Sequence, residues 1–136
     1  MTGEDRLIDW LRRQTRQRGT DLLGDDAAVL PETAPVVTVD QQIAGTHFPA
    51  DLAAPVVARR LLAVCLSDLA AMGAEPGHAF LALTMPEGFE PRPFFSALLA
   101  ACDAYDTVLA GGDLARGPVL ASALTLCGRL PARGRI

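Results

Sequence analysis

The sequence contains no lysine and no asparagine, and all twelve of its basic residues are arginine. A GC-rich genome would explain both absences, because lysine and asparagine have A-rich codons. The absence of lysine still excludes two common ATP-binding machineries. A Walker P-loop needs a glycine-lysine-serine/threonine run, and a protein kinase needs a lysine on its third strand. Any ATP chemistry in this chain must therefore use other residues.

Long uncharged apolar runs are also absent, although half of the 136 residues are hydrophobic and the mean hydropathy is +0.25. A membrane-spanning helix needs about 18 or more apolar residues. The best candidate, residues 53–72, carries Arg59, Arg60 and Asp68. The N-terminus is acidic and lacks the basic start of a signal peptide. We therefore expect a soluble, cytoplasmic protein with no membrane partner.

Charge and cysteine usage exclude further classes of function. Sixteen acidic residues against twelve basic ones give a net charge of −4, which argues against binding to nucleic acid. The cysteines Cys65, Cys102 and Cys127 show no CxxC spacing, and each lies among apolar residues. We interpret them as buried small hydrophobic residues rather than as metal ligands or redox centres.

Hydrophobic periodicity predicts a series of helices and strands. The length of the chain favours a single domain. Helices are expected at residues 4–17, 55–73 and 91–105, and strands at 27–30, 36–40, 78–84, 107–110 and 119–130, with 41–48 a loop or a further strand. This order favours an α+β domain in which a mixed or antiparallel sheet has its helices packed on one face.

The positions of the aspartates are the most informative feature of the chain. Asp26, beside Asp25, precedes a predicted strand, Asp40 ends one, and Asp113 follows a predicted Gly-Gly turn after another. Strand ends gather along one edge of a sheet, and close carboxylates repel each other unless cations bind them. Asp68 lies on the apolar stripe of a helix, so it needs a cation or a hydrogen-bonding partner. Each aspartate alone is more simply a turn or cap residue. For Asp25, this structural role and a role in the site are equally favoured.

Taken together, Asp26, Asp40, Asp68 and Asp113 indicate a site for Mg²⁺ and phosphate. Other candidates are weaker. His47 alone would be a surface or packing residue, and Arg116 would contact either a phosphate or solvent. The aromatic pair at residues 94–95 is more simply core, with adenine stacking as the second interpretation.

Several sequence blocks resemble the thiamine-monophosphate kinases, a family within the wider AIR synthase-like superfamily. The run GDDAAVL (residues 24–30) is followed by VTVD (37–40) and GTHF (45–48). The block LSDLAAMGAEP (66–76) is the most specific, and a GGD run followed by RGP (111–118) completes the pattern. These blocks have compatible spacing and cover nearly the whole chain.

The resemblance implies an AIR synthase N-terminal-like domain that forms a homodimer through its strands and binds Mg-ATP along a groove. The implied reaction transfers the γ-phosphate of ATP to thiamine monophosphate by direct in-line attack, which gives thiamine diphosphate and ADP. The implied residues are Asp26, Thr38, Asp40, Asp68 and Asp113 for Mg²⁺, Gly112 and Asp113 for ATP, Phe95 near adenine, and His47 at the thiamine phosphate.

Some positions depart from the family pattern. Val39 replaces the usual threonine beside the metal-binding aspartate, and Cys65 stands where asparagine is usual. The family enzymes also carry a C-terminal domain of similar size. We therefore expect residues 1–136 to be a single N-terminal domain that does not turn over alone.

Two alternatives stay open. One is another ATP-dependent enzyme of the superfamily, such as AIR synthase, selenophosphate synthetase or a hydrogenase-maturation protein. The absence of an N-terminal catalytic cysteine and of a C-terminal cysteine tail disfavours the last two. The other alternative is a non-catalytic, dimeric nucleotide-binding module.

Overall fold

Helices and strands alternate along the part of the chain that the structure describes. The computed structural model describes residues 3–17, 28–29 and 35–132. In chain order the elements are α1 (Gly3–Gln17), β1 (Ala28–Val29), β2 (Val36–Ile43), α2 (Ala54–Ala71), β3 (Glu75–Met85), α3 (Arg92–Ala104), β4 (Val108–Arg116) and β5 (Ala121–Arg129). None of these helices is long and apolar enough to cross a membrane. The helices expected at 4–17, 55–73 and 91–105 and the strand expected at 119–130 are confirmed to within two residues.

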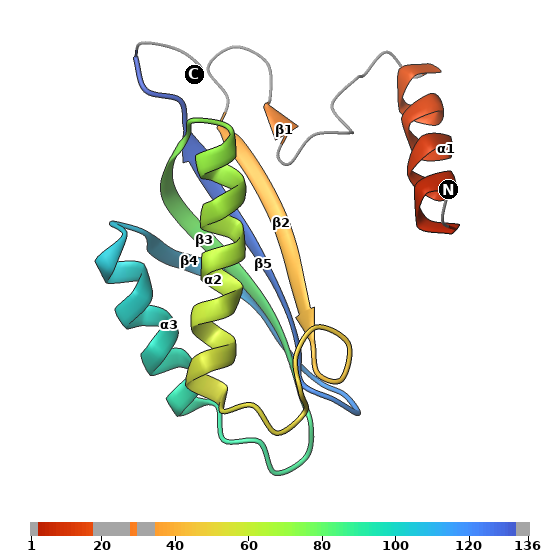
Figure 1. Cartoon of the computed structure of the whole chain (residues 1–136). Helices are drawn as coiled ribbons and strands as arrows, with labels where there is room; N and C mark the ends of the chain where they lie inside the picture. Colours follow the sequence, from red (N-terminus) through yellow and green to blue (C-terminus); the bar gives the residue numbers. More distant parts are fainter. Residues whose placement is uncertain (1–2, 18–27, 30–34, 133–136) are drawn as a thin grey trace.

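The strands form one mixed sheet in the order β1-β2-β5-β3-β4. Only β3 and β4 run parallel, and α3 makes the crossover between them that a parallel pair requires. The other neighbouring strands are antiparallel. Both α2 and α3 lie on the same face of the sheet (Figure 1). The predicted α+β architecture is therefore confirmed.

The core lies between these two helices and the sheet. Its largest fully buried side chains come from α2, α3 and the two central strands: Leu61, Leu62, Leu69, Leu83, Phe94, Leu98, Leu124 and Leu126. Helix α2 begins with a proline in its first turn, where the missing N–H costs nothing. It stops before Gly73, whose φ of 67° suits glycine. The core thus fixes α2 across β2 and β5.

Two strand predictions need correction. Strand β2 does not end at Asp40 but continues to Ile43. The predicted Gly-Gly turn before Asp113 is wrong, because β4 continues through both glycines, with a register shift against β3 just before them. Gly112 has a φ of 153°, and a Cβ there would lie 1.8 Å from the Leu81 carbonyl oxygen. Glycine is needed at this position for close approach of two strands, not for a reversal of the chain.

Candidate functional site

Strand β2 has an inverted distribution of polar and apolar side chains. By strand alternation, Thr38, Asp40 and Gln42 share the side that faces α2. Thr38 and Gln42 are buried there, whereas Val39, on the opposite side, is 63% exposed. A strand whose polar residues point inward needs polar partners under the helix. The candidate site therefore begins between β2 and α2.

Asp68 has the hydrogen-bonding partner that its sequence position required. The Thr38 hydroxyl donates to Asp68 Oδ2 over 2.8 Å. Thr38 is only 3% exposed, so the contact is shielded from solvent. This bond ties the C-terminal half of α2 to the middle of β2 and fixes one oxygen of the Asp68 carboxylate.

The thiol of Cys65 lies beside both carboxylates of this flank. It is fully buried and donates weakly to the Leu124 carbonyl oxygen, 3.6 Å away. Burial, then the negative charges of Asp40 and Asp68, raise the pKa of this thiol to about 12. Asp40 is two residues from Thr38 on the same side of β2, and Thr38 bonds Asp68, so both carboxylates belong to this flank. Cys65 is therefore a protonated, buried residue, as the sequence indicated.

The donors on this flank fit Mg²⁺ better than a soft metal. Mg²⁺ is usually held by one or two carboxylates, completed by waters and substrate phosphates. Asp40 and Asp68 supply such a pair and remain partly exposed, while the Cys65 thiol is fully buried and directed at the Leu124 carbonyl oxygen. Within residues 3–17, 28–29 and 35–132, no three His, Cys, Asp or Glu side chains form a metal site. Asp25 and Asp26 lie outside those residues.

His47 lies in a tight turn at the end of β2. The His47 N–H donates to the Ile43 carbonyl oxygen at 2.9 Å, and Gly45 N–H donates to the Phe48 carbonyl oxygen at 2.8 Å. Gly45 has a φ of 81°, which explains glycine at this turn. A cavity of about 440 Å³ adjoins the turn and is lined by Val39, Asp40, Gln41, His47 and Ala123. The structure thus brings His47 and Asp40 to one cavity.

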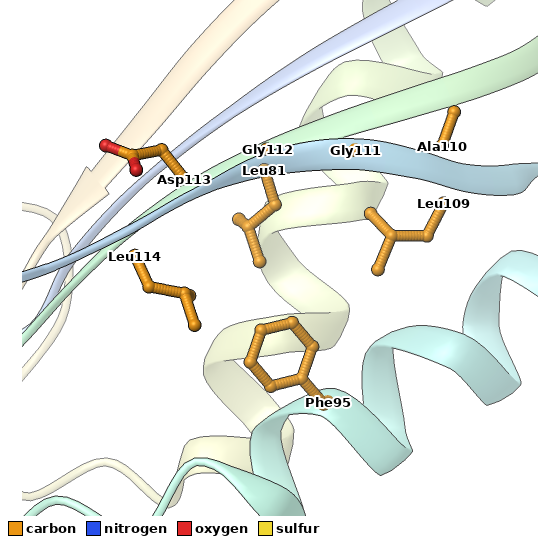
Figure 2. A pocket seen from close by; sticks show the side chains of 8 residues that line it. All are labelled: Leu81, Phe95, Leu109, Ala110, Gly111, Gly112, Asp113 and Leu114. Carbon is orange, nitrogen blue, oxygen red and sulfur yellow. The ribbon is translucent and has the colours of Figure 1, made fainter.

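A second cavity lies near the opposite edge of the sheet, between β4 and α3. It has a volume of about 570 Å³, and its lining is mostly apolar: Leu81, Phe95, Leu109, Ala110, Gly111, Gly112, Asp113 and Leu114. Figure 2 shows the leucine side chains and the Phe95 ring converging on this space, whereas the Asp113 carboxylate points away from the ring. Phe95 also packs edge-on against Phe94 of the core, with ring centroids 5.7 Å apart.

Asp113 does not lie beside Asp40 within one chain. Register pairs join Gln41 to Ala123, Ala123 to Ala82, and Ala82 to Asp113, in one row across the sheet. Three strand spacings separate the ends of that row, which is about 14 Å. The structure therefore brings Thr38, Asp40, Asp68 and His47 to one flank, and Gly112, Asp113 and Phe95 to the other.

Sequence reasoning did not single out Gln42. Its side chain is 6% exposed, and its Oε1 has no hydrogen-bond partner among the described residues. The signal was available, since polar residues at 38, 40 and 42 alternate with others along a strand. Arg116 stays exposed and lines a further cavity of about 520 Å³ with Phe89. That cavity is separate from both flanks.

Comparison with known sequences adds a family to this geometry. The model of the AIR synthase related protein N-terminal domain matches residues 24–130. Thiamine-monophosphate kinase of Salmonella typhimurium is 45% identical over 115 residues, which cover 81% of this chain and 35% of that protein. The Caulobacter vibrioides protein of the same name is 47% identical over 132 residues, covering 90% and 37%. This chain thus spans little more than a third of the length of these relatives.

Solved structures agree with these sequence relatives. A structure described as AaThiL complexed with AMPPCP and TMP has a TM-score of 0.81 at 25% identity, covering 90% of this chain and 40% of that one. Thiamine-monophosphate kinase from Stenotrophomonas maltophilia has a TM-score of 0.64 at 43% identity, covering 90% and 41%. The expected resemblance and fold are therefore confirmed.

Proposed function

Because the chain belongs to the AIR synthase related proteins, we propose that it is the N-terminal domain of a thiamine-monophosphate kinase. The proposed reaction transfers the γ-phosphate of ATP to thiamine monophosphate in the cytoplasm. The identity to proteins of that name supports the assignment. The observation that carries it is the arrangement of two carboxylates around the buried Thr38: Asp68 accepts from its hydroxyl, and Asp40 follows it on the same side of β2.

The β2 flank has the chemistry that phosphoryl transfer between two phosphates needs. Mg²⁺ held by Asp40 and Asp68 would neutralise charge on the phosphates during in-line transfer. Asp26 is a further proposed ligand, and the Thr38 oxygen another. An acceptor phosphate oxygen is already anionic, so these residues need no general base beside them. Their task is to position and to stabilise charge.

The β4 flank suits the nucleotide. A mostly apolar cavity with one half-buried aromatic ring fits a purine base, and Phe95 is the ring in question. Gly111 and Gly112 have no side chains, so a phosphate chain can pass close to the β4 backbone. Asp113 lies one residue farther along and faces the other side of the sheet. We assign ATP to this flank, with Asp113 toward its phosphates.

A homodimer would bring the two flanks together. The sheet face opposite α2 and α3 carries Val39, Phe80 and Val108, which are 63%, 41% and 56% exposed. Exposed apolar side chains of this size on one sheet face are typical of an interface. Two-fold packing of two such faces can set β2 of one copy against β4 of its partner. The cavity that Asp40 and His47 line also includes Val39 and Ala123 of this opposite face, so Asp113 of one copy would face that cavity in the other.

Mixing two inactive variants tests the shared site. Asp68→Asn and Asp113→Asn subunits are each expected to be inactive alone. If each site takes Asp68 from one copy and Asp113 from the other, a mixed dimer has one intact site. Random mixing would then restore up to about a quarter of wild-type activity. No recovery in dimers shown to have exchanged subunits would contradict a shared site.

The assigned reaction has a direct test. The full-length gene product is incubated with ATP, Mg²⁺ and thiamine monophosphate, and the products are separated by chromatography. We expect thiamine diphosphate and ADP in equal amounts. If Mg-ATP binds but neither product forms, the acceptor is wrong and another AIR synthase related reaction becomes the better assignment.

A further inference from the structure

Cys127 differs from the other two cysteines of the chain in its surroundings. Cys65 and Cys102 are buried, whereas Cys127 on β5 is only half-buried. Its neighbours Leu126 and Gly128 are buried, so by strand alternation the Cys127 side chain lies on the sheet face opposite α2 and α3 (Figure 1). The prediction that all three cysteines are buried is therefore wrong for Cys127.

His78 lies beside Cys127 on this open face of the sheet. The two residues are register partners on the antiparallel strands β3 and β5, and a register shift at Gly77 brings His78 level with Cys127. Side chains of register partners lie on the same face, with their Cβ atoms about 4.5–5.5 Å apart. Both residues line one cavity of about 340 Å³. A thiol and an imidazole are therefore neighbours in one open space.

A neighbouring thiol and imidazole form half of a zinc site. Zn²⁺ is most often held by four thiolate and imidazole ligands in a tetrahedron, whereas Mg²⁺ prefers oxygen. Asp106 lines the same cavity. Even so, no three His, Cys, Asp or Glu side chains of the described residues come together as a metal site. Arg129, which also lines the cavity, pairs with Glu75, with Nε 3.8 Å from Oε2. One chain therefore offers two ligands for zinc.

The proposed homodimer places a second pair of ligands opposite the first. From β2 to β4, the order of strands is β2-β5-β3-β4. If β2 packs against the β4 strand of the partner, the order is reversed across the interface, so β5 lies against the partner's β3. The two-fold axis then runs along the strands, and each row of register partners meets the same row of the other copy. Cys127 thus lies opposite the partner's His78, and His78 lies opposite the partner's Cys127.

We propose that two copies of this chain hold one Zn²⁺ ion at their interface through Cys127 and His78 of each copy. The inference rests on the dimer of the proposed function. Packed sheets are about 10 Å apart, so an ion midway lies about 5 Å from each sheet. A cysteine side chain with a Zn–S bond of about 2.3 Å spans that distance. Each thiol releases its proton to solvent when it binds zinc, and no electrons are transferred. The ion joins the two copies and takes no part in phosphoryl transfer.

Zinc uptake by the full-length gene product tests the number of ions. Metal-free protein is titrated with Zn²⁺ in excess Mg²⁺, which occupies the carboxylates of the β2 flank, and the dimer is isolated for metal analysis. We expect wild type to hold one Zn²⁺ per two chains more than Cys127→Ser. Co²⁺ in place of Zn²⁺ should give the visible bands of a tetrahedral ion with thiolate ligands, and Cys127→Ser should lack them. Equal zinc content in the two proteins would overturn the proposal.

Variants in one cavity identify the ligands. Cys127→Ser and His78→Asn each remove two of the four ligands in a dimer. We expect each to weaken zinc binding by more than about a hundredfold. Asp106→Asn is the matched control, because it lines the same cavity, and it should bind zinc like wild type. Circular dichroism shows whether each variant is folded. One ion per chain that is lost in Asp106→Asn would indicate a site within one chain and would overturn the proposal.

The zinc site and the proposed function can fail separately. A dimer that holds zinc but forms no thiamine diphosphate would leave the zinc site standing and refute the kinase assignment. A dimeric enzyme that forms thiamine diphosphate but takes up no zinc at Cys127 would refute the zinc site alone. A protein that sediments as a monomer with and without Zn²⁺ would overturn both the zinc site and the proposed dimer.

Discussion

The two flanks of the sheet differ in polarity, in burial and in how they are joined to the helices. At the β2 flank, polar groups are half-buried and joined to α2 by hydrogen bonds from Thr38 and Arg60. At the β4 flank, an edge strand that is exposed at every residue except Leu109 borders a mostly apolar cavity, and Gly111 and Gly112 present no side chains. A rigid polar flank suits charge that must be placed accurately. An open apolar flank suits a flat base that binds by burial.

Removal of the Asp68 carboxylate from the β2 flank should have the largest effect on turnover. Asp68→Asn keeps the size of the side chain but takes away a charge that we propose holds Mg²⁺. We expect turnover of the full-length enzyme to fall by more than about a hundredfold. Asp103→Asn, an exposed aspartate on α3, is the control and should retain activity. Wild-type turnover in Asp68→Asn would remove the β2 flank from the mechanism.

Substitution of Gly111 and Gly112 tests whether the close contact between β4 and β3 is needed for stability. In Gly112→Ala, the new Cβ overlaps the Leu81 carbonyl oxygen, and the φ of 153° is strained for alanine. We expect the free energy of unfolding in urea to fall by about 2 kcal/mol or more. In Gly111→Ala, the Cβ meets the Phe80 ring at 3.3 Å, and that ring is partly exposed and can turn. If the two variants are equally stable, β4 does not need close approach at Gly112.

Phe95 tests the β4 flank as a base-binding surface. Phe95→Ala should raise the KM for ATP roughly tenfold, because stacking on a base contributes about 1–3 kcal/mol. The KM for thiamine monophosphate should change little, since that ligand is assigned to the other flank. The neighbouring Phe94 is fully buried. Phe94→Ala should instead lower stability by about 3–5 kcal/mol, and an ATP-specific effect of Phe94 alone would reverse the assignment.

The Thr38 hydroxyl tests how far the β2 flank depends on its hydrogen bond. Thr38→Val keeps the shape and leaves Asp68 Oδ2 without this donor, in a part-buried position. We expect a loss of about 1–2 kcal/mol in the free energy of unfolding. Thr38→Ser restores a hydroxyl and should recover most of the loss. Thermal or urea unfolding of the three proteins decides between these outcomes.

The sequence predicted what depends on local pattern. Helix α2 was predictable because Pro55, Gly73 and an apolar stripe mark its ends and its buried face. A polar partner for Asp68 was predictable, because a lone carboxylate on an apolar stripe needs one. Which residue it is was not predictable. Thr38 is thirty residues away in sequence, so only the fold identifies it.

Long-range placement was not available from the pattern. The Gly-Gly run suggested a turn because glycine favours turns, but here its cause is a close contact with Leu81 across the sheet. The separation of Asp40 from Asp113 follows from β5 and β3 lying between their strands. Strand order depends on pairing between distant segments, which no local periodicity records. The sequence therefore predicted which aspartates belong to a metal site, but not that Asp40 and Asp113 lie on different flanks of the sheet.

Helix α2 contacts the β2 flank at two points and so fixes the distance between them. Arg60 near its first turns holds the carbonyl of the histidine turn, and Asp68 near its last turns holds Thr38. Eight residues of helix set these anchor points about 12 Å apart. Because a helix is stiff along its axis, the Asp68 end and the His47 end of the flank are expected to move together. A change that tilts α2 at one anchor should misalign the other, so defects at the two ends should not combine as independent ones.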